Sequence, residues 1–209
     1  IMAERYVITL GRECGAGATY IAQHLSKELG IPYYDKDIFR MVSDKSGVLE
    51  EFFHVNSERP GNNLLYKLVK DLKPADQKPS LGKDIVSPDN LFRFQSELIR
   101  ELADNESCII IGRCADYVLK DHDNCVHVFV CGDMDSKVQR MMHSYSLEES
   151  AAVERIKETD KQRKKYYSYY TGGDWEAASN YDLCLNTGDM TIEEAAEQIL
   201  FYLKQKKYI

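Results

Sequence analysis

The glycine-rich segment at residues 11–19 is the part of this sequence best suited to chemistry. It reads Gly-Arg-Glu-Cys-Gly-Ala-Gly-Ala-Thr. Glycine has no Cβ, so main-chain N–H groups in such a loop can turn toward an anion, and the N-terminus of a following helix adds partial positive charge. The segment follows an apolar run at 6–10 and precedes helically spaced apolar residues that end at Gly30. The sequence therefore predicts a phosphate-binding loop between a strand and a helix.

The loop departs from the common phosphate-loop pattern G-x-x-x-x-G-K-[ST]. When Gly17 is aligned with the second glycine, Arg12 stands at the first glycine, Ala18 at the lysine and Thr19 at the magnesium-binding hydroxyl. Two alternatives stay open: Thr19 merely caps the helix, or the segment is a tight turn that binds nothing. We expect nucleotide phosphates to be bound by main-chain donors, with the Thr19 hydroxyl on Mg²⁺; the donors are Gly15, Ala16, Gly17, Ala18 and Thr19.

Charged residues follow the predicted strands closely. Arg12, Asp35 and Arg113 each come at or just after an apolar run, and ligands of parallel sheets bind at the carboxyl ends of the strands. Arg12 would supply the charge of the missing lysine, because a guanidinium can bind a phosphate through two hydrogen bonds. The alternative is a surface arginine paired with Glu13. Arg113, next to a glycine at a strand end, is the strongest candidate for a site arginine.

Three further side chains could serve a phosphate acceptor. Asp35 could accept the proton of an acceptor hydroxyl or hold metal-bound water; alternatively it caps the helix that begins at Lys36. Arg40 could reach an acceptor phosphate, although a helical arginine is more often solvated. Asp116 could orient Arg113.

A basic and aromatic stretch occupies residues 161–170. Its Arg163 and Lys164 are candidates to close over donor phosphates, against the plain alternative of a solvated helix face. Ser146 and Glu149 have the spacing of a capping box and predict the start of the long helix that carries this stretch. Its four tyrosines cannot all face one way on a helix, so some are expected to pack against the core and others could line the site or a subunit contact.

Strands and helices alternate along the chain, which predicts an α/β fold with a five-stranded parallel sheet and helices on both faces. A second capping box at Thr191 and Glu194 predicts the start of the last helix. Prolines and glycines gather between 47 and 90, which we interpret as an insertion containing one short helix at 64–72. The expected strands lie at 6–10, 31–35, 108–111, 126–131 and 181–186.

Composition limits the classes of partner. The chain has 209 residues and a net charge of −7, so it lacks the overall basic charge of proteins that bind nucleic acid or anionic membranes. Six cysteines without a C-x-x-C pair, and no signal or membrane-spanning segment, indicate reduced thiols and a cytoplasmic protein. Cys114, His122, Cys125 and His127 lie close enough to suggest zinc, but their spacing fits no finger pattern, and a satisfied core histidine is favoured for His127.

Several of these segments together resemble the cytidylate kinase-like family, a branch of the P-loop nucleoside monophosphate kinases. That family also places arginine at the start of the loop and often lacks the loop lysine. Its glycine-arginine-aspartate motif is matched here by Gly112 and Arg113, but Cys114 replaces the aspartate; either Asp116 substitutes for it or the acceptor differs. The segments that carry the resemblance are Gly11–Ala18, Ile31–Asp37, Ile111–Tyr117, Asp160–Gly172 and Asn180–Leu183.

The resemblance implies a single P-loop kinase-like domain over 1–209. It implies an acceptor-binding insertion at about 47–90 and a lid at about 144–173 that closes on the donor. The activity implied is ATP- and Mg²⁺-dependent phosphoryl transfer to a small acceptor, by default a nucleoside monophosphate. The alternative is a catalytically weak or inactive nucleotide-sensing protein with a kinase fold, which Ala18 favours; Arg113 and the arginine of the lid favour the enzyme. A homo-oligomer is compatible with both.

Overall fold

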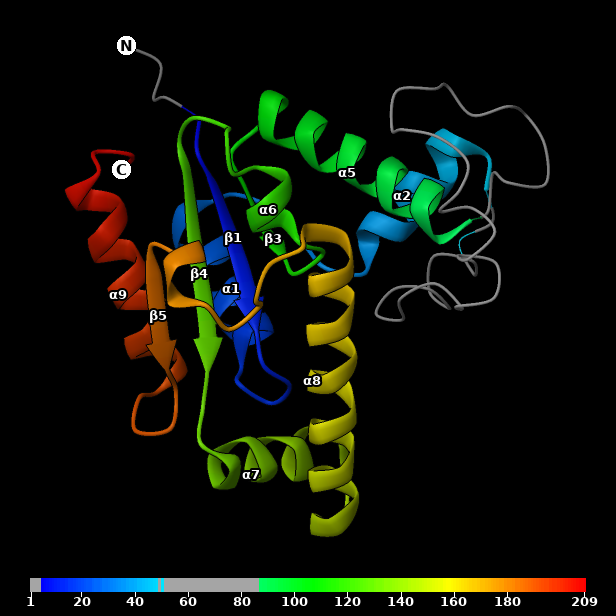
Figure 1. Ribbon diagram of the computed structural model, residues 1–209. Helices are drawn as coiled ribbons and strands as arrows, with labels where there is room; N and C mark the ends of the chain where they lie inside the picture. Colours follow the sequence, from blue (N-terminus) through cyan, green and yellow to red (C-terminus); the bar gives the residue numbers. More distant parts are fainter. Residues whose placement is uncertain (1–4, 49, 51–86) are drawn as a thin grey trace.

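The computed structural model describes residues 5–48, 50 and 87–209 (Figure 1). Its core is one sheet of five parallel strands in the order β2-β3-β1-β4-β5, as the sequence predicts. The apolar strands β1, β3 and β4 occupy the middle, because a parallel sheet buries both of its faces. The strands are β1 (Val7–Arg12), β2 (Tyr33–Tyr34), β3 (Cys108–Ile111), β4 (Cys125–Cys131) and β5 (Leu183–Asn186).

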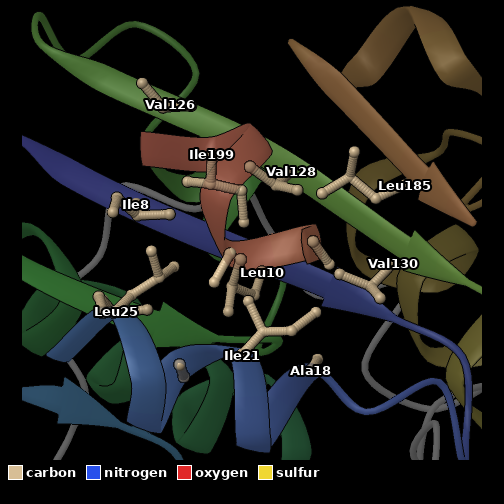
Figure 2. Packing of buried hydrophobic residues seen from close by; sticks show 14 of the residues in the cluster. Ile8, Leu10, Ala18, Ile21, Leu25, Val126, Val128, Val130, Leu185 and Ile199 are labelled. Carbon is tan, nitrogen blue, oxygen red and sulfur yellow. The ribbon is translucent and has the colours of Figure 1, made fainter. Parts of the chain in front are cut away.

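Helices cover both faces of the sheet. On one face, α1 (Ala18–Leu29) and α9 (Ile192–Gln205) pack against alternate residues of β1 and β4. Figure 2 shows Ile8 and Leu10 of β1 beside Ile21 and Ile199 of these helices. On the other face lie α2 (Asp37–Ser46), α5 (Pro88–Asn105) and the short α6 (Ala115–Val118).

Two further helices extend beyond the sheet. α7 (Met134–Tyr145) follows β4, and the long α8 (Glu149–Thr171) packs against it (Figure 1). A 3₁₀ turn at Ala178–Asn180 then leads to β5. The expected helix at 64–72 and most of the insertion expected at 47–90 lie outside the described residues.

One of the two predicted capping boxes is confirmed. The Thr191 hydroxyl accepts a hydrogen bond from the Glu194 amide at 3.1 Å, and the Glu194 carboxylate accepts one from the Thr191 amide at 2.8 Å. The other prediction is wrong: Ser146 ends α7 with φ 52°, and α8 begins after Glu148 without a side-chain cap. Ser146 adopts the left-handed conformation that turns the chain from one helix into the next, so it does not precede α8 directly.

Replacing Thr191 tests how much this cap contributes to stability. We expect Thr191→Ala to lower the free energy of unfolding by about 1 kcal/mol, because the Glu194 amide loses its acceptor. Urea denaturation measures the loss. Thr191→Ser keeps the hydroxyl and is expected to retain most of the stability, so an alanine variant as stable as the serine variant would contradict this account.

An aromatic cluster fixes the C-terminal half of α8 to the sheet. Tyr166, Tyr167 and Trp175 are buried with Phe129 of β4. The Trp175 ring meets Phe129 edge-on, with centroids 5.3 Å apart. Tyr170, one turn after Tyr166 on the same face of α8, stacks on Phe92 of α5 at 4.0 Å, and its ring centroid lies 4.7 Å from that of Tyr166. The tyrosines of this stretch therefore pack mainly against the body of the protein, as the helical spacing predicts for part of them.

His127 has the hydrogen-bond partner expected of a structural histidine, and it is half-buried instead of lying fully in the core. Its Nδ1 lies 2.8 Å from the Thr9 hydroxyl of β1, and burial lowers the pKa of the imidazole. The described part of the chain holds no group of three histidine, cysteine or acidic side chains that could bind a metal ion. All six cysteines are free thiols. Within the same residues, no helix combines the length and apolar character needed to cross a membrane.

Candidate functional site

A cavity of about 660 Å³ opens at the carboxyl end of the sheet. It lies beside β1, where the direction of the connections reverses: the chain leaves β1 toward β2 at one edge, and later passes from β3 across β1 to β4 on the other side. Ligands of open parallel sheets bind at such a point. The predicted loop forms one wall, and residues that follow β2 and β3 form another. Residues from α7 and α8 complete the lining.

The glycine loop has the backbone that its composition predicts. Gly15 and Gly17 have φ of 81° and 89°, values that side chains disfavour. A Cβ on Gly15 would lie 2.8 Å from the Lys137 carbonyl oxygen, and one on Gly17 would lie 2.4 Å from Ile192. α1 begins at Ala18 with no side-chain cap, so Thr19 lies inside the first turn and does not cap the helix. Gly17, Ala18, Thr19 and Tyr20, at the start of α1, line the cavity, and the first N–H groups of a helix have no partner within it.

Five arginines from four parts of the chain line this cavity. Three of them, Arg12, Arg113 and Arg163, were candidates from the sequence, and Arg140 and Arg155 join them. A guanidinium N–H of Arg163 donates to the Arg12 carbonyl at 3.2 Å. This convergence is unusual in a chain with a net charge of −7, and it makes the cavity suited to anions.

Gly112 allows Arg12 to reach across the end of β3. A Cβ at Gly112 would lie 1.8 Å from Nη1 of Arg12, and the φ of Gly112 is 69°. Gly112, which precedes Arg113, therefore leaves the space that the Arg12 guanidinium of the neighbouring strand occupies. The carboxylate of Glu13, the partner considered for Arg12, accepts a hydrogen bond from Lys137 at 2.9 Å.

Arg113 is held from several directions. Its Nη2 lies 4.0 Å from the Asp35 carboxylate, and its guanidinium lies over the Phe39 ring at 3.9 Å. Gln95 donates to its main-chain carbonyl at 3.3 Å. Asp35 does not cap α2, because Lys36 occupies the cap position and no side chain bonds there. The structure thus brings Asp35 and Arg113 together on one wall of the cavity.

Three predicted residues lie away from this cavity. Arg40 is exposed, 3.7 Å from Asp37. Lys164 pairs at the surface with Glu176 at 2.6 Å, because successive helical residues face different directions and Arg163 takes the side toward the cavity. Asp116 is buried and accepts a hydrogen bond from the Tyr167 hydroxyl at 2.7 Å. Burial raises the pKa of Asp116. The functions predicted for these three residues stay predictions.

Asp116 also lines a second, smaller cavity of about 30 Å³. This space lies between the aromatic cluster and the arginines, since Arg12, Arg113 and Arg163 line both cavities. A void of this size accepts about one water molecule. The three arginines therefore lie between the main cavity and this smaller space.

The contribution of α7 was missed from the sequence. Nη1 of Arg140 donates to the Gly15 carbonyl at 3.2 Å and to the Thr187 hydroxyl at 3.1 Å, and so ties the glycine loop to the segment after β5. Lys137 lies on the same helix. Two basic residues three positions apart, just after a strand, were the available signal, because that spacing places both on one face of a helix.

Comparisons with known proteins agree with this geometry. The model of the cytidylate kinase-like family matches residues 7–189. A cytidylate kinase from Methanobrevibacter smithii is 24% identical over 199 residues, covering 95% of this chain and 98% of that protein. A cytidylate kinase from Methanopyrus kandleri is 26% identical over 198 residues, covering 90% and 88% of the two chains.

Solved structures share the fold over nearly the whole chain. An uncharacterized protein from Eubacterium ventriosum is 25% identical with a TM-score of 0.70, covering 96% of this chain and 99% of that one. A shikimate kinase from Acinetobacter baumannii is 14% identical with a TM-score of 0.52, covering 98% and 96%. The second likeness shows the P-loop kinase fold alone. With a family match over residues 7–189, this chain belongs to the cytidylate kinase-like family.

Proposed function

We propose that this protein transfers a phosphoryl group from ATP to a small acceptor, by default a nucleoside monophosphate. The observation that carries the proposal is the convergence of five arginines on one cavity beside a glycine loop. Phosphoryl transfer needs positioning and positive charge more than covalent chemistry from the protein. A volume of about 660 Å³ is within the usual range for small-molecule sites, roughly 300–1,000 Å³.

The walls of the cavity suggest which substrate lies where. Main-chain N–H groups of the loop and the start of α1 would bind the donor phosphates, and the Thr19 hydroxyl would hold Mg²⁺. The metal would offset negative charge on those phosphates. Arg12 and Arg163, which meet at the end of β1, would stabilise the transferring group. The wall with Arg113 and Asp35 would bind the acceptor.

In this arrangement the acceptor oxygen attacks the terminal phosphorus of the donor. The bond from that phosphorus to the bridging oxygen breaks, and ADP leaves. Where the acceptor is a hydroxyl, Asp35 would take its proton; where the acceptor is already a phosphate, no proton transfer is needed. Arg113, 4.0 Å from Asp35, would hold an acceptor phosphate beside that carboxylate.

The two curated relatives described above are named cytidylate kinases, and CMP is therefore the first acceptor to test. The change from aspartate to Cys114 in the family motif, with Asp116 turned toward Tyr167, leaves room for a different acceptor. A catalytically weak or inactive sensor is the second candidate. Ala18 at the lysine position favours it, and so does the Cys14 amide, which is already engaged by the Asp160 carboxylate at 2.6 Å.

Thermal shift and turnover together test the proposal. We expect MgATP at a hundred times its Kd to stabilise the folded protein by about 2.7 kcal/mol, a rise in Tm of several degrees for a chain of this size. We also expect ADP release with CMP or another nucleoside monophosphate, measured by a coupled assay. A shift without turnover across nucleotides and small metabolites would support the sensor. No shift with ATP, CTP or GTP would contradict both candidates.

We further propose a cytoplasmic location, which the six free thiols support. No nucleic acid or membrane partner is expected of an acidic chain, and a homo-oligomer stays a proposal. Size-exclusion chromatography with light scattering would measure the oligomeric state directly.

A further inference from the structure

A buried lysine lies directly behind the glycine loop. Lys137 of α7 has a side chain only 7% exposed, and its Nζ is 2.9 Å from the Glu13 carboxylate and 3.5 Å from that of Asp160. A lysine is rarely this buried unless it is paired. Burial alone would lower the pKa of Lys137, but its hydrogen bonds and attraction to the two carboxylates outweigh burial and raise it. The ammonium is therefore charged at neutral pH.

The two carboxylates connect three parts of the site. Glu13 belongs to the loop itself and also accepts a hydrogen bond from the Gly132 amide at 3.1 Å, at the end of β4. Asp160 belongs to α8, and its carboxylate accepts a hydrogen bond from the Cys14 amide at 2.6 Å. Lys137 joins these two acids from α7. The loop, α7 and α8 thus meet at a cluster of two acids and one base, which we call the loop-base cluster.

The charge of this cluster matters for a polyanionic ligand. Glu13 lines the cavity, and Asp160 accepts a hydrogen bond from the amide of Cys14, which also lines it, so both carboxylates lie close to the position expected for donor phosphates. Two unpaired carboxylates beside the loop would repel the phosphates of the ligand strongly, because the effective dielectric constant of a partly buried site is lower than that of water. Lys137 reduces the charge of the cluster from −2 to −1. Ala18 provides no lysine on the loop itself, so this compensation has to come from elsewhere.

We propose that Lys137 is a positioning residue of the donor site, which offsets one of the two negative charges of the Glu13 and Asp160 carboxylates so that the loop can accept a polyphosphate. It acts through those two side chains and does not line the main cavity itself. The inference rests on the proposed function in one respect: the loop must be the donor phosphate site.

Charge-changing variants of the cluster distinguish this role from a structural one. Lys137→Met is expected to weaken MgATP binding by about tenfold or more, since one uncompensated charge a few ångströms away is worth at least that factor. Glu13→Gln removes a negative charge and keeps an acceptor for Lys137, so it should bind MgATP about threefold more tightly than wild type. The double variant is expected to bind close to wild type. Isothermal titration calorimetry measures all four affinities.

If the cluster only held the loop in place, Glu13→Gln would disturb the loop and weaken MgATP binding. The direction of the change in MgATP affinity therefore distinguishes the electrostatic role from a structural one. Lys137→Met leaves two buried acids without their base and could fail to fold; in that case Glu13→Gln against wild type carries the test alone. Lys45→Met is the matched control, since it removes a lysine from the exposed pair with Glu101 and should not change MgATP affinity.

The inference fails if Glu13→Gln weakens MgATP binding, or if a folded Lys137→Met variant binds as wild type does. A wild-type protein that binds no MgATP would overturn the proposed function itself, and the inference with it. The two failures are distinguishable because only the second removes binding from the unmodified chain.

Discussion

Arg113→Met is expected to lower kcat/KM for the acceptor by about 10³-fold while MgATP affinity stays near that of wild type. Arg113 would hold the acceptor phosphate, and truncating one partner of a buried, hydrogen-bonded charge pair costs about 2–5 kcal/mol, a range that includes 10³-fold. Methionine retains much of the packing over Phe39, which the guanidinium now covers at 3.9 Å, and so limits the loss of stability. Steady-state kinetics with varied acceptor, beside calorimetry with MgATP, separates the two substrates.

Two companion variants sharpen this result. Arg113→Lys keeps the charge and loses the planar fork, so we expect it to fall between wild type and the methionine variant. Arg100→Met changes an exposed arginine of α5 and should leave the kinetics unchanged. If a folded Arg113→Met variant keeps its acceptor kinetics within about twofold, Arg113 has no place at the acceptor site.

Gly15→Ala is expected to weaken MgATP binding by about 100-fold, an effect typical of displacing binding groups by about an ångström. Its Cβ would lie 2.8 Å from the Lys137 carbonyl oxygen. That neighbour is main chain of α7 and cannot rotate away, so the loop must move and take its N–H groups with it. Calorimetry with MgATP measures the binding, and urea denaturation measures the stability.

Gly30→Ala is the matched control for this variant. Gly30 also has positive φ, 65°, but no atom lies within 4 Å of its added Cβ. We expect the Gly30→Ala variant to lose about 1 kcal/mol of stability, because alanine disfavours positive φ, and to bind MgATP as tightly as wild type. Equal binding by the Gly15→Ala and Gly30→Ala variants would show that the close approach of α7 to the loop has no role in binding.

The strands were predictable because their residue types leave little choice. Cys108–Ile111 is wholly apolar and the structure buries it completely, as the middle of a parallel sheet requires. β2 is shorter than expected, two residues instead of five; among the described residues it lies at the edge of the sheet and pairs with β3 alone, at Tyr33 and Tyr34. The two capping boxes had the same spacing, and only tertiary packing decided that Ser146 ends a helix.

The site was predictable where topology alone positions the residue. Arg12, Asp35 and Arg113 come at strand ends, and the parallel sheet brings those ends to one edge. Whether Lys137 and Arg140 reach the site depends on how α7 lies against the loop. That orientation arises from the packing of α7 on α8 and on Cys14, contacts between segments far apart in the chain, for which the local pattern has no signal.

The aromatic cluster also gives the protein an optical probe of its own. Trp175 is the single tryptophan of the chain, and it is buried against Phe129 where α8 meets the sheet. Excitation at the red edge of the tyrosine band therefore selects one indole at one known place. Without an added label, its emission reports whether the C-terminal end of α8 is packed against the sheet.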